Sequence, residues 1–194
     1  MSEAQQDRAQ AAQLPEGDVI RILLEQHARI RDLFADVSSA EGDHKQHAFD
    51  ELRALLAVHE TAEEMVLRPA TKSTSGGDKV ADARNHEESE ANKVLKELEK
   101  MDVASTEFDT RLAAFEKAVS DHAEAEESEE FPQILSSCDT DKRATMGKQL
   151  KAAEGIAPTH PHPTAAGSPT AQFAVGPMAS LVDRTRDAIG KVTG

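Results

Sequence analysis

Four stretches of this chain repeat apolar residues at the spacing of an α-helix. They lie at residues 18–37, 44–72, 78–101 and 107–136. In each stretch the apolar side chains recur three or four residues apart, which places them on one face of a helix. The pair Gly76-Gly77 interrupts the pattern between the second and third stretches. Long helices joined by short connections predict an all-α fold, an up-down-up-down four-helix bundle.

The composition agrees with a helical fold and narrows the classes of partner. Tyr and Trp are absent and there are only 6 Phe, while Ala, Glu, Leu and Lys, which favour helices, are abundant. The net charge of −14 argues against nucleic acid and anionic membranes as partners. A single cysteine, Cys138, excludes an internal disulfide. Residues 1–17 lack the apolar core of a signal peptide, and no apolar run nears the roughly 20 residues of a membrane span. We therefore expect a cytoplasmic protein.

The pattern divides the chain into five segments. Residues 1–16 are predicted to be a disordered polar lead, residues 17–138 the four-helix bundle, and residues 139–154 a short helix. Residues 155–177 are rich in Pro and Gly and are predicted to be a linker. Residues 178–194 carry apolar residues at helical spacing. They are predicted to form a C-terminal amphipathic helix, which docks on the bundle or on a protein partner.

One phrase occurs twice, once in the second stretch and once in the fourth. It reads H-x-x-x-E-E, with His59 and Glu63 in the first copy and His122 and Glu126 in the second, and a proline follows each histidine by ten residues. A histidine and a glutamate four residues apart lie one turn apart on the same helix face, as two ligands of one metal ion must. Either copy alone is better explained as an exposed ion pair. Two copies in the same register favour two halves of one site.

Two further histidines complete the candidate site. His27 and His86 lie mid-helix on the apolar faces of the first and third stretches, so the bundle brings four histidines and two glutamates to one level. Burying these groups together is costly unless a metal pairs with them. Nitrogen and oxygen ligands without thiolate suit iron or manganese better than a structural zinc. The donor count favours two ions joined by an oxo or hydroxo bridge, with ligands assigned as follows: His27 and His59 on one ion, His86 and His122 on the other, and Glu63 and Glu126 bridging both.

The order of the ligands separates two families of carboxylate-bridged metal proteins. Ferritin-like proteins use Glu-x-x-His, but the residues three before these histidines are Leu24, Leu56, Ala83 and Val119. Residues 18–136 instead resemble the hemerythrin family, in its bacterial hemerythrin-like (HHE cation-binding) branch. The matching residues are His27, His59 with Glu63, His86, and His122 with Glu126. The resemblance implies a four-helix bundle with a non-heme di-iron centre. The two iron ions of such a centre interact with O2, NO or peroxide.

The chain departs from the oxygen-carrying hemerythrins at two places. Those proteins have a second histidine one turn after the ligand on the third helix, where this chain has Glu90. Their last carboxylate is an aspartate at plus five, where this chain has Glu127 beside Glu126. A carboxylate in place of an imidazole stabilises ferric iron, which favours sensing, peroxide handling or NO chemistry over reversible oxygen carriage. Glu90 is a candidate ligand or a partner that orients a histidine. Glu60 is a further candidate ligand, with an exposed helix charge as the alternative.

Three functions are compatible with this pattern. The leading one is a di-iron protein that handles or senses a small oxidant, with peroxide-consuming or NO-handling activity left open. The alternative is an iron-homeostasis binding module without redox turnover, in which metal stabilises the bundle. The third is a metal-free acidic bundle, which predicts that replacing His59 or His122 leaves the fold unchanged.

Overall fold

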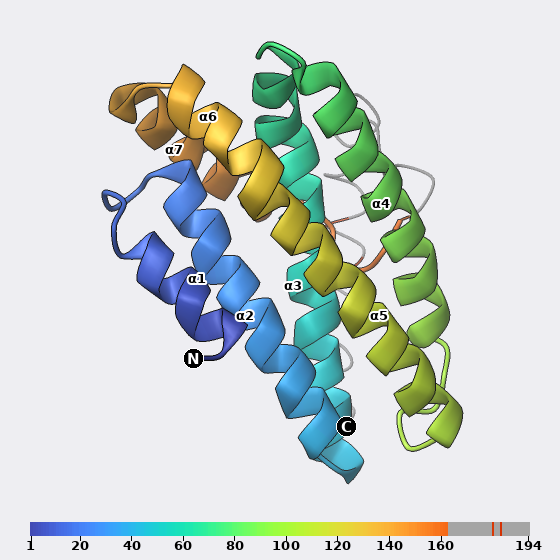
Figure 1. The fold of residues 1–194 in the computed structure, drawn as a ribbon. Helices are drawn as coiled ribbons and strands as arrows, with labels where there is room; N and C mark the ends of the chain where they lie inside the picture. Colours follow the sequence, from blue (N-terminus) through green and yellow to red (C-terminus); the bar gives the residue numbers. More distant parts are fainter. Residues whose placement is uncertain (163–179, 181–182, 184–194) are drawn as a thin grey trace.

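A computed structural model of the chain describes residues 1–162, 180 and 183, and within them all regular secondary structure is helical. In chain order the helices are α1 (Glu3–Ala11), α2 (Val19–Ser39), α3 (Gly42–Lys72), α4 (Gly77–Leu98), α5 (Thr106–Ala125), the π-helical turn η1 (Glu126–Glu130), α6 (Phe131–Ser137) and α7 (Thr140–Ile156). Figure 1 shows α2, α3, α4 and α5 as long neighbouring rods, with α6 continuing the line of α5. The predicted all-α fold is confirmed.

The ends of the bundle helices are set by residues suited to them. The side chain of Asp18 caps α2 by accepting a hydrogen bond from the backbone N–H of Ile20. The hydroxyl of Ser105 caps α5 by accepting from the backbone N–H of Phe108. Gly76, just before α4, has φ 78°, a left-handed backbone that glycine adopts without strain. Observed and predicted helix ends agree to within three residues throughout the bundle.

Two apolar clusters fill the bundle, and a polar layer separates them. One cluster joins residues of α2, α3, α6 and α7, including Ile20, Leu67 and Ile134. The other joins residues of α2, α3, α4 and α5, including Leu33, Leu52 and Phe108. His27 on α2 and His59 on α3 fall between the two clusters. The bundle therefore holds a layer of ionisable side chains that is shielded from water on both sides.

The N-terminus differs from the sequence prediction of a disordered lead at residues 1–16. Helix α1 lies along α2 (Figure 1). It begins with a capping box, in which the side chains of Ser2 and Gln5 each accept a hydrogen bond from the other's backbone N–H. Asp7 is 2% exposed and its carboxylate lies 2.9 Å from Nε of Arg31 on α2. Caps and polar contacts hold this helix rather than an apolar stripe, so hydrophobic periodicity does not reveal it.

Helix α7 occupies the place predicted for a short helix at residues 139–154 and packs on α2 and α3. A glycine permits this close packing. A Cβ atom at Gly147 would lie 2.1 Å from the carbonyl oxygen of Gly17, so any larger residue there would push the chain apart.

The segment after α7 is only partly described. A solvated linker is predicted for residues 155–177, yet His160 is buried and contacts the carboxylate of Glu99. The first two residues of that segment belong to α7, and residues 163–177 lie outside the described residues. So does the C-terminal helix predicted at residues 178–194, apart from Ser180 and Asp183.

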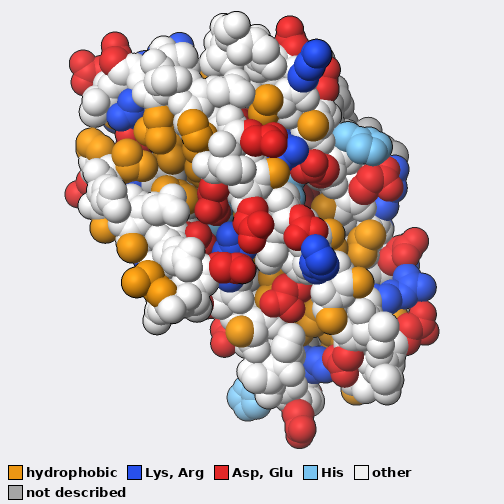
Figure 2. All heavy atoms as spheres, in the orientation of Figure 1, with side chains coloured by type: hydrophobic (Ala, Val, Ile, Leu, Met, Phe, Trp, Pro, Cys, Tyr) orange, Lys and Arg blue, Asp and Glu red, His pale blue; other side chains and the backbone are white. Residues whose placement is uncertain are grey.

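The surface reflects the charge of the chain. Acidic side chains predominate over basic ones on the face in Figure 2, as the net charge of −14 leads one to expect. In the described part of the chain, no helix combines the length and the apolar character needed to span a membrane.

Candidate metal centre

Three histidines and three glutamates from five helical elements, α2, α3, α4, α5 and η1, meet in the polar layer. They form two groups in which each residue offers one donor atom within 4.8 Å of the others. The first group is His27, His59, Glu63 and Glu126, and the second is Glu63, Glu88, His122 and Glu126. Glu63 and Glu126 belong to both groups, as two carboxylates shared between two ions would.

Within these groups, the Nε2 atom of each histidine lies close to a carboxylate oxygen. Nε2 of His27 lies 3.2 Å from Oε2 of Glu126, and Nε2 of His59 lies 3.3 Å from Oε2 of Glu63. Nε2 of His122 lies 3.2 Å from Oε1 of Glu126. Each H-x-x-x-E motif thus brings its nitrogen and oxygen to the same place, as the spacing predicts.

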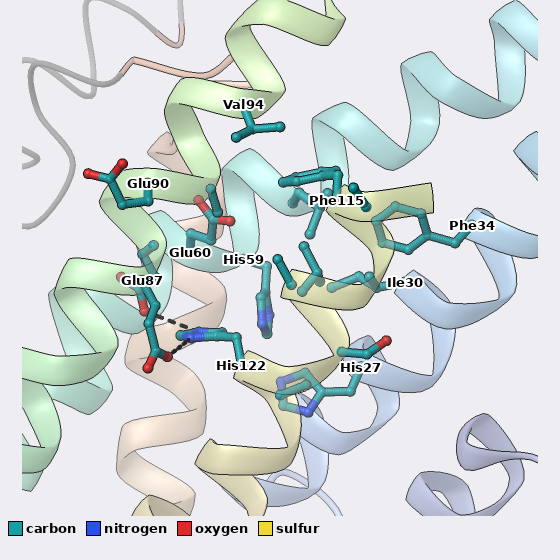
Figure 3. A pocket seen from close by; sticks show the side chains of 18 of the residues that line it. His27, Ile30, Phe34, His59, Glu60, Glu87, Glu90, Val94, Phe115 and His122 are labelled. Carbon is teal, nitrogen blue, oxygen red and sulfur yellow. Dashed lines mark hydrogen bonds and ion pairs between the residues drawn. The ribbon is translucent and has the colours of Figure 1, made fainter. Parts of the chain in front are cut away.

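The outer nitrogen of two of the rings is held by a carboxylate. Nδ1 of His27 lies 2.8 Å from Oε1 of Glu127, and Nδ1 of His122 lies 2.8 Å from Oε2 of Glu87 (Figure 3). A carboxylate only accepts, so Nδ1–H donates and Nε2, the nitrogen that would bind a metal, is the one that faces the cluster. Metal-binding histidines are commonly oriented in this way.

His59 is oriented by an amide instead. Its Nδ1 lies 2.8 Å from Oε1 of Gln26, and the Gln26 amide in turn donates to Glu154 of α7 at 2.6 Å. Burial and the charge on His27 lower the pKa of His59 to about 3. His59 is therefore a neutral imidazole, the form that binds metal.

Six buried nitrogen and oxygen atoms of the two groups make no hydrogen bond of regular geometry, although some lie close to one another. They are Nε2 of His27, both carboxylate oxygens of Glu63, Oε2 of Glu88, Nε2 of His122 and Oε2 of Glu126. Leaving a buried polar atom unsatisfied costs about 1–3 kcal/mol, and more for a charged group. These atoms all lie on residues of the two groups, and a cation placed among them would satisfy them. The residues present therefore fit a bound metal.

The carboxylates respond differently to burial. Burial raises the pKa of Glu63 and of Glu88 well above the ordinary value. Burial also raises the pKa of Glu126, but the charges of His122 and Arg68 outweigh it and hold that pKa well below the ordinary value. Glu126 is thus the carboxylate most firmly kept as an anion between the two groups.

Arg68 is a member of the site that the sequence pattern does not reveal. Its side chain is fully buried, and its guanidinium contacts Glu88 and Glu126 and lies 2.5 Å from Oε2 of Glu130 and 3.6 Å from Oε2 of Glu63. Four buried carboxyl groups thus surround one arginine. A metal ion would stabilise their charged forms.

A π-helical turn carries the last ligand. Glu126–Glu130 form η1 between α5 and α6, and the extra residue of a π-turn shifts which side chains face inward. Glu126 and Glu130 are both fully buried, while Glu127 reaches His27. Pro132, in the first turn of α6, has no N–H to continue the regular ladder. Such turns are common at functional sites.

The structure does not bring His86 to the metal groups. His86 is exposed on α4, and Glu88 enters the second group in its place. The buried face of α4 runs through Ala81, Arg84, Glu88, Asn92 and Leu95, which also recur at three and four residues. Because three of these are polar, counting apolar residues selects the neighbouring face that carries His86.

Glu60 and Glu90 have different surroundings. Glu60 is buried, and its Oε2 accepts a hydrogen bond of 2.5 Å from Nδ2 of Asn92, so it is not an exposed helix charge; it belongs to neither metal group. Glu90 is 56% exposed and pairs with Lys93 at 2.6 Å. It belongs to neither metal group, and other side chains contact the Nδ1 atoms of the three clustered histidines.

A cavity of about 500 Å³ adjoins the three histidines and is lined by side chains of α2, α3, α4 and α5. Figure 3 looks into it, with His27, His59 and His122 gathered at one end. A small molecule in this cavity would therefore lie next to the candidate metal groups.

Comparison with known proteins agrees with this arrangement. The family model described as "Hemerythrin HHE cation binding domain" matches residues 18–134. The chain is also similar to an uncharacterized hemerythrin-like protein from Schizosaccharomyces pombe (strain 972 / ATCC 24843). The two are 25% identical over 138 residues, which cover 70% of this chain and 68% of that protein. No solved structure matches the chain.

Proposed function

Because this chain belongs to the hemerythrin HHE cation-binding domain family, we propose that it is a non-heme di-iron protein that handles or senses O2, peroxide or NO. The observation that carries the proposal is the set of buried, unpartnered donor atoms in two groups that share Glu63 and Glu126. Two groups with shared carboxylates suit two ions better than one. Nitrogen and carboxylate donors without thiolate suit iron.

The geometry supports a revised ligand assignment. His27 and His59 would hold the first ion, His122 and Glu88 the second, and Glu63 and Glu126 would bridge them. The second ion would then have one imidazole and more carboxylate than the first. Carboxylates stabilise the ferric state, so this donor set favours reaction with an oxidant over reversible oxygen carriage.

Ferrous iron bound here supplies the electrons that a small oxidant takes up. The chain's own residues prepare the site for it. Glu127 and Glu87 fix the rings of His27 and His122, and the Phe131 ring stacks on His27 with centroids 5.6 Å apart. The two apolar clusters keep bulk water from the polar layer, which strengthens the electrostatic interactions inside it.

A binding module for iron homeostasis, without redox turnover, is the second candidate. Its support is the set of four buried carboxyl groups around Arg68, because a bound cation would stabilise their charged forms and with them the fold. A thermal melt with and without iron, beside a peroxide-consumption assay, separates the two candidates. A large stabilisation without loss of peroxide favours the module.

We also propose a compartment, a ligand and a class of partner for the protein. We infer a reducing compartment, the cytoplasm, from the single cysteine of the chain. We infer a small diatomic or peroxide ligand from the buried donor atoms of the metal groups. The acidic net charge speaks against nucleic acid as a partner. A protein partner would bind to residues 178–194.

Anaerobic loading with ferrous iron tests the leading proposal. The loaded protein is mixed separately with O2, hydrogen peroxide and NO, and its absorption spectrum is followed. Because the chain has neither Tyr nor Trp, the near-ultraviolet background is low and ferric absorption stands out. We expect oxidation or a nitrosyl spectrum with at least one of the three. A loaded protein whose spectrum none of them changes would contradict oxidant handling and leave the binding module.

A further inference from the structure

The cavity beside the histidines is much larger than a diatomic ligand or hydrogen peroxide requires. Its volume is about 500 Å³. A water molecule in the liquid has a share of about 30 Å³, and small oxidants are of similar size. Cavities of about 300–1,000 Å³ are typical of sites for organic ligands. The volume of this cavity therefore fits an organic ligand better than a small oxidant.

The walls of the cavity are apolar along most of their length. They are formed by Ile30 and Phe34 of α2, Leu56 of α3, Val94 of α4, and Phe115 and Val119 of α5. Ile30, Phe34, Val94 and Phe115 surround the space in Figure 3. An apolar cavity gains little from holding water, but it gains from covering the apolar surface of an organic molecule.

The inner end of the cavity is formed by the three histidines of the metal groups. His27, His59 and His122 lie there in Figure 3, and Glu88 also lines the cavity. Exposed charged residues line it as well, namely Glu90, Glu97 and Arg111. Nε2 of His27 and Nε2 of His122 are buried without a hydrogen-bond partner. A ligand in the cavity would thus have its apolar part against the hydrophobic walls and its reactive end toward the metal groups.

The outer end of the cavity opens between α4 and α5. Val94 on α4 is 37% exposed, and Ala114 and Ala118 on α5 are exposed as well, while all three line the cavity. Hydrophobic side chains are visible between α4 and α5 in Figure 2. The cavity is therefore open to a ligand from outside and closed at the histidines.

We propose that this cavity binds the apolar body of an organic hydroperoxide and directs the peroxide group to the metal groups. The inference rests on the proposed di-iron function and names its substrate class. Reduction breaks the O–O bond: the hydroperoxide ROOH takes up two electrons and two protons and gives the alcohol ROH and water. Two ferrous ions held by the metal groups would supply the two electrons, one each, and solvent would supply the protons.

The binding step is tested with alcohols, which are the products of this reaction and are redox-inert. The iron-loaded protein is titrated with 1-butanol, 1-hexanol and 1-octanol by calorimetry. Each buried CH2 should raise the affinity about two- to fourfold until the cavity is full. An affinity that does not rise with chain length overturns the proposal.

A matched pair of variants on α4 locates the binding. Ala91 is half-buried and lines the cavity, whereas Ala83 is exposed and does not. Ala91→Phe fills the cavity and should weaken 1-octanol binding at least tenfold, while Ala83→Phe should change it less than twofold. Val119→Phe on α5 serves the same purpose if Ala91→Phe does not fold. Equal affinity in the filled variant and the control overturns the proposal.

Kinetics then separate the substrate class from the redox function. In single-turnover mixing with the ferrous-loaded protein, we expect the second-order rate constant of oxidation by cumene hydroperoxide to exceed that by hydrogen peroxide at least tenfold, and Ala91→Phe to remove that preference. If hydrogen peroxide is consumed but no alcohol binds, the di-iron function stands and the cavity proposal is wrong. If alcohols bind but neither peroxide is consumed, the redox function and the hydroperoxide assignment both fall.

Discussion

Nδ1 of His122 lies 2.8 Å from Oε2 of Glu87, so a carboxylate holds the ring nitrogen that faces away from the metal groups. Such a contact fixes the tautomer and the angle of the ring, and losing it lowers metal affinity about 10–100-fold in comparable sites. We predict a loss of that size for Glu87→Ala, measured by competition with a metal chelator. Glu90→Ala, on the same helix, is the control, because Glu90 is exposed and pairs only with Lys93 among the described interactions. Equal affinity in both variants would contradict the orienting role.

Glu88 should be required for the second ion, and His86 should not. Glu88→Gln keeps the size of the side chain but replaces the charged oxygen that lies in the second group, so we expect iron content to fall by about one ion per chain. His86 is exposed on α4, and His86→Ala should keep the full content. Iron analysis after desalting reads out both variants. Loss of iron in His86→Ala with none in Glu88→Gln would restore the assignment made from the sequence.

Arg68 should stabilise the metal-free protein. Its guanidinium is fully buried among four carboxylates. Removing one partner of a buried charge pair costs about 3–5 kcal/mol. We predict that Arg68→Met lowers the free energy of unfolding by this amount in urea with a chelator present. Bound iron should recover part of the loss.

The control for this prediction is Arg29→Met. Arg29 is 45% exposed and pairs with Glu51 at the surface, where a substitution changes stability by about 0.5 kcal/mol or less. A stability change of equal size in the two variants would show that Arg68 does not neutralise the carboxylates.

Acid should destabilise the bundle partly through Glu99. Although burial raises the pKa of Glu99, hydrogen bonds from His160 and Lys96 lower it from 4.5 to about 2. The folded-state pKa is depressed, so the contribution of Glu99 is complete above pH 4.5 and is lost as the pH falls toward 2. Glu99→Gln should therefore lose less stability than the parent between pH 4.5 and 2. Parallel stability curves for the two proteins would contradict this contribution.

The sequence predicts the bundle well because helices are marked by patterns among residues that are close together in the chain. Hydrophobic periodicity and glycine at position 76 locate α2 to α6 to within a few residues, and the i,i+4 spacing pairs His59 with Glu63 and His122 with Glu126. These relations depend only on helix geometry. The rotation of a helix about its axis depends on packing against its neighbours, which a single sequence does not contain.

That difference explains what the sequence misses. On α4, packing turns Glu88 inward and His86 outward, although both faces have helical spacing. The position of Arg68 depends on carboxylates from α4 and η1, which are distant in the sequence. The π-helical turn that buries both Glu126 and Glu130 also has no simple sequence signal beyond Pro132.

Metal content tests the central claim most directly. The protein is purified without added metal, its iron and zinc are quantified, and its near-ultraviolet and visible spectrum is recorded with and without azide. The two groups around Glu63 and Glu126 predict about two irons per chain and ferric bands that azide perturbs. No iron, or one zinc per chain, would contradict the di-iron centre.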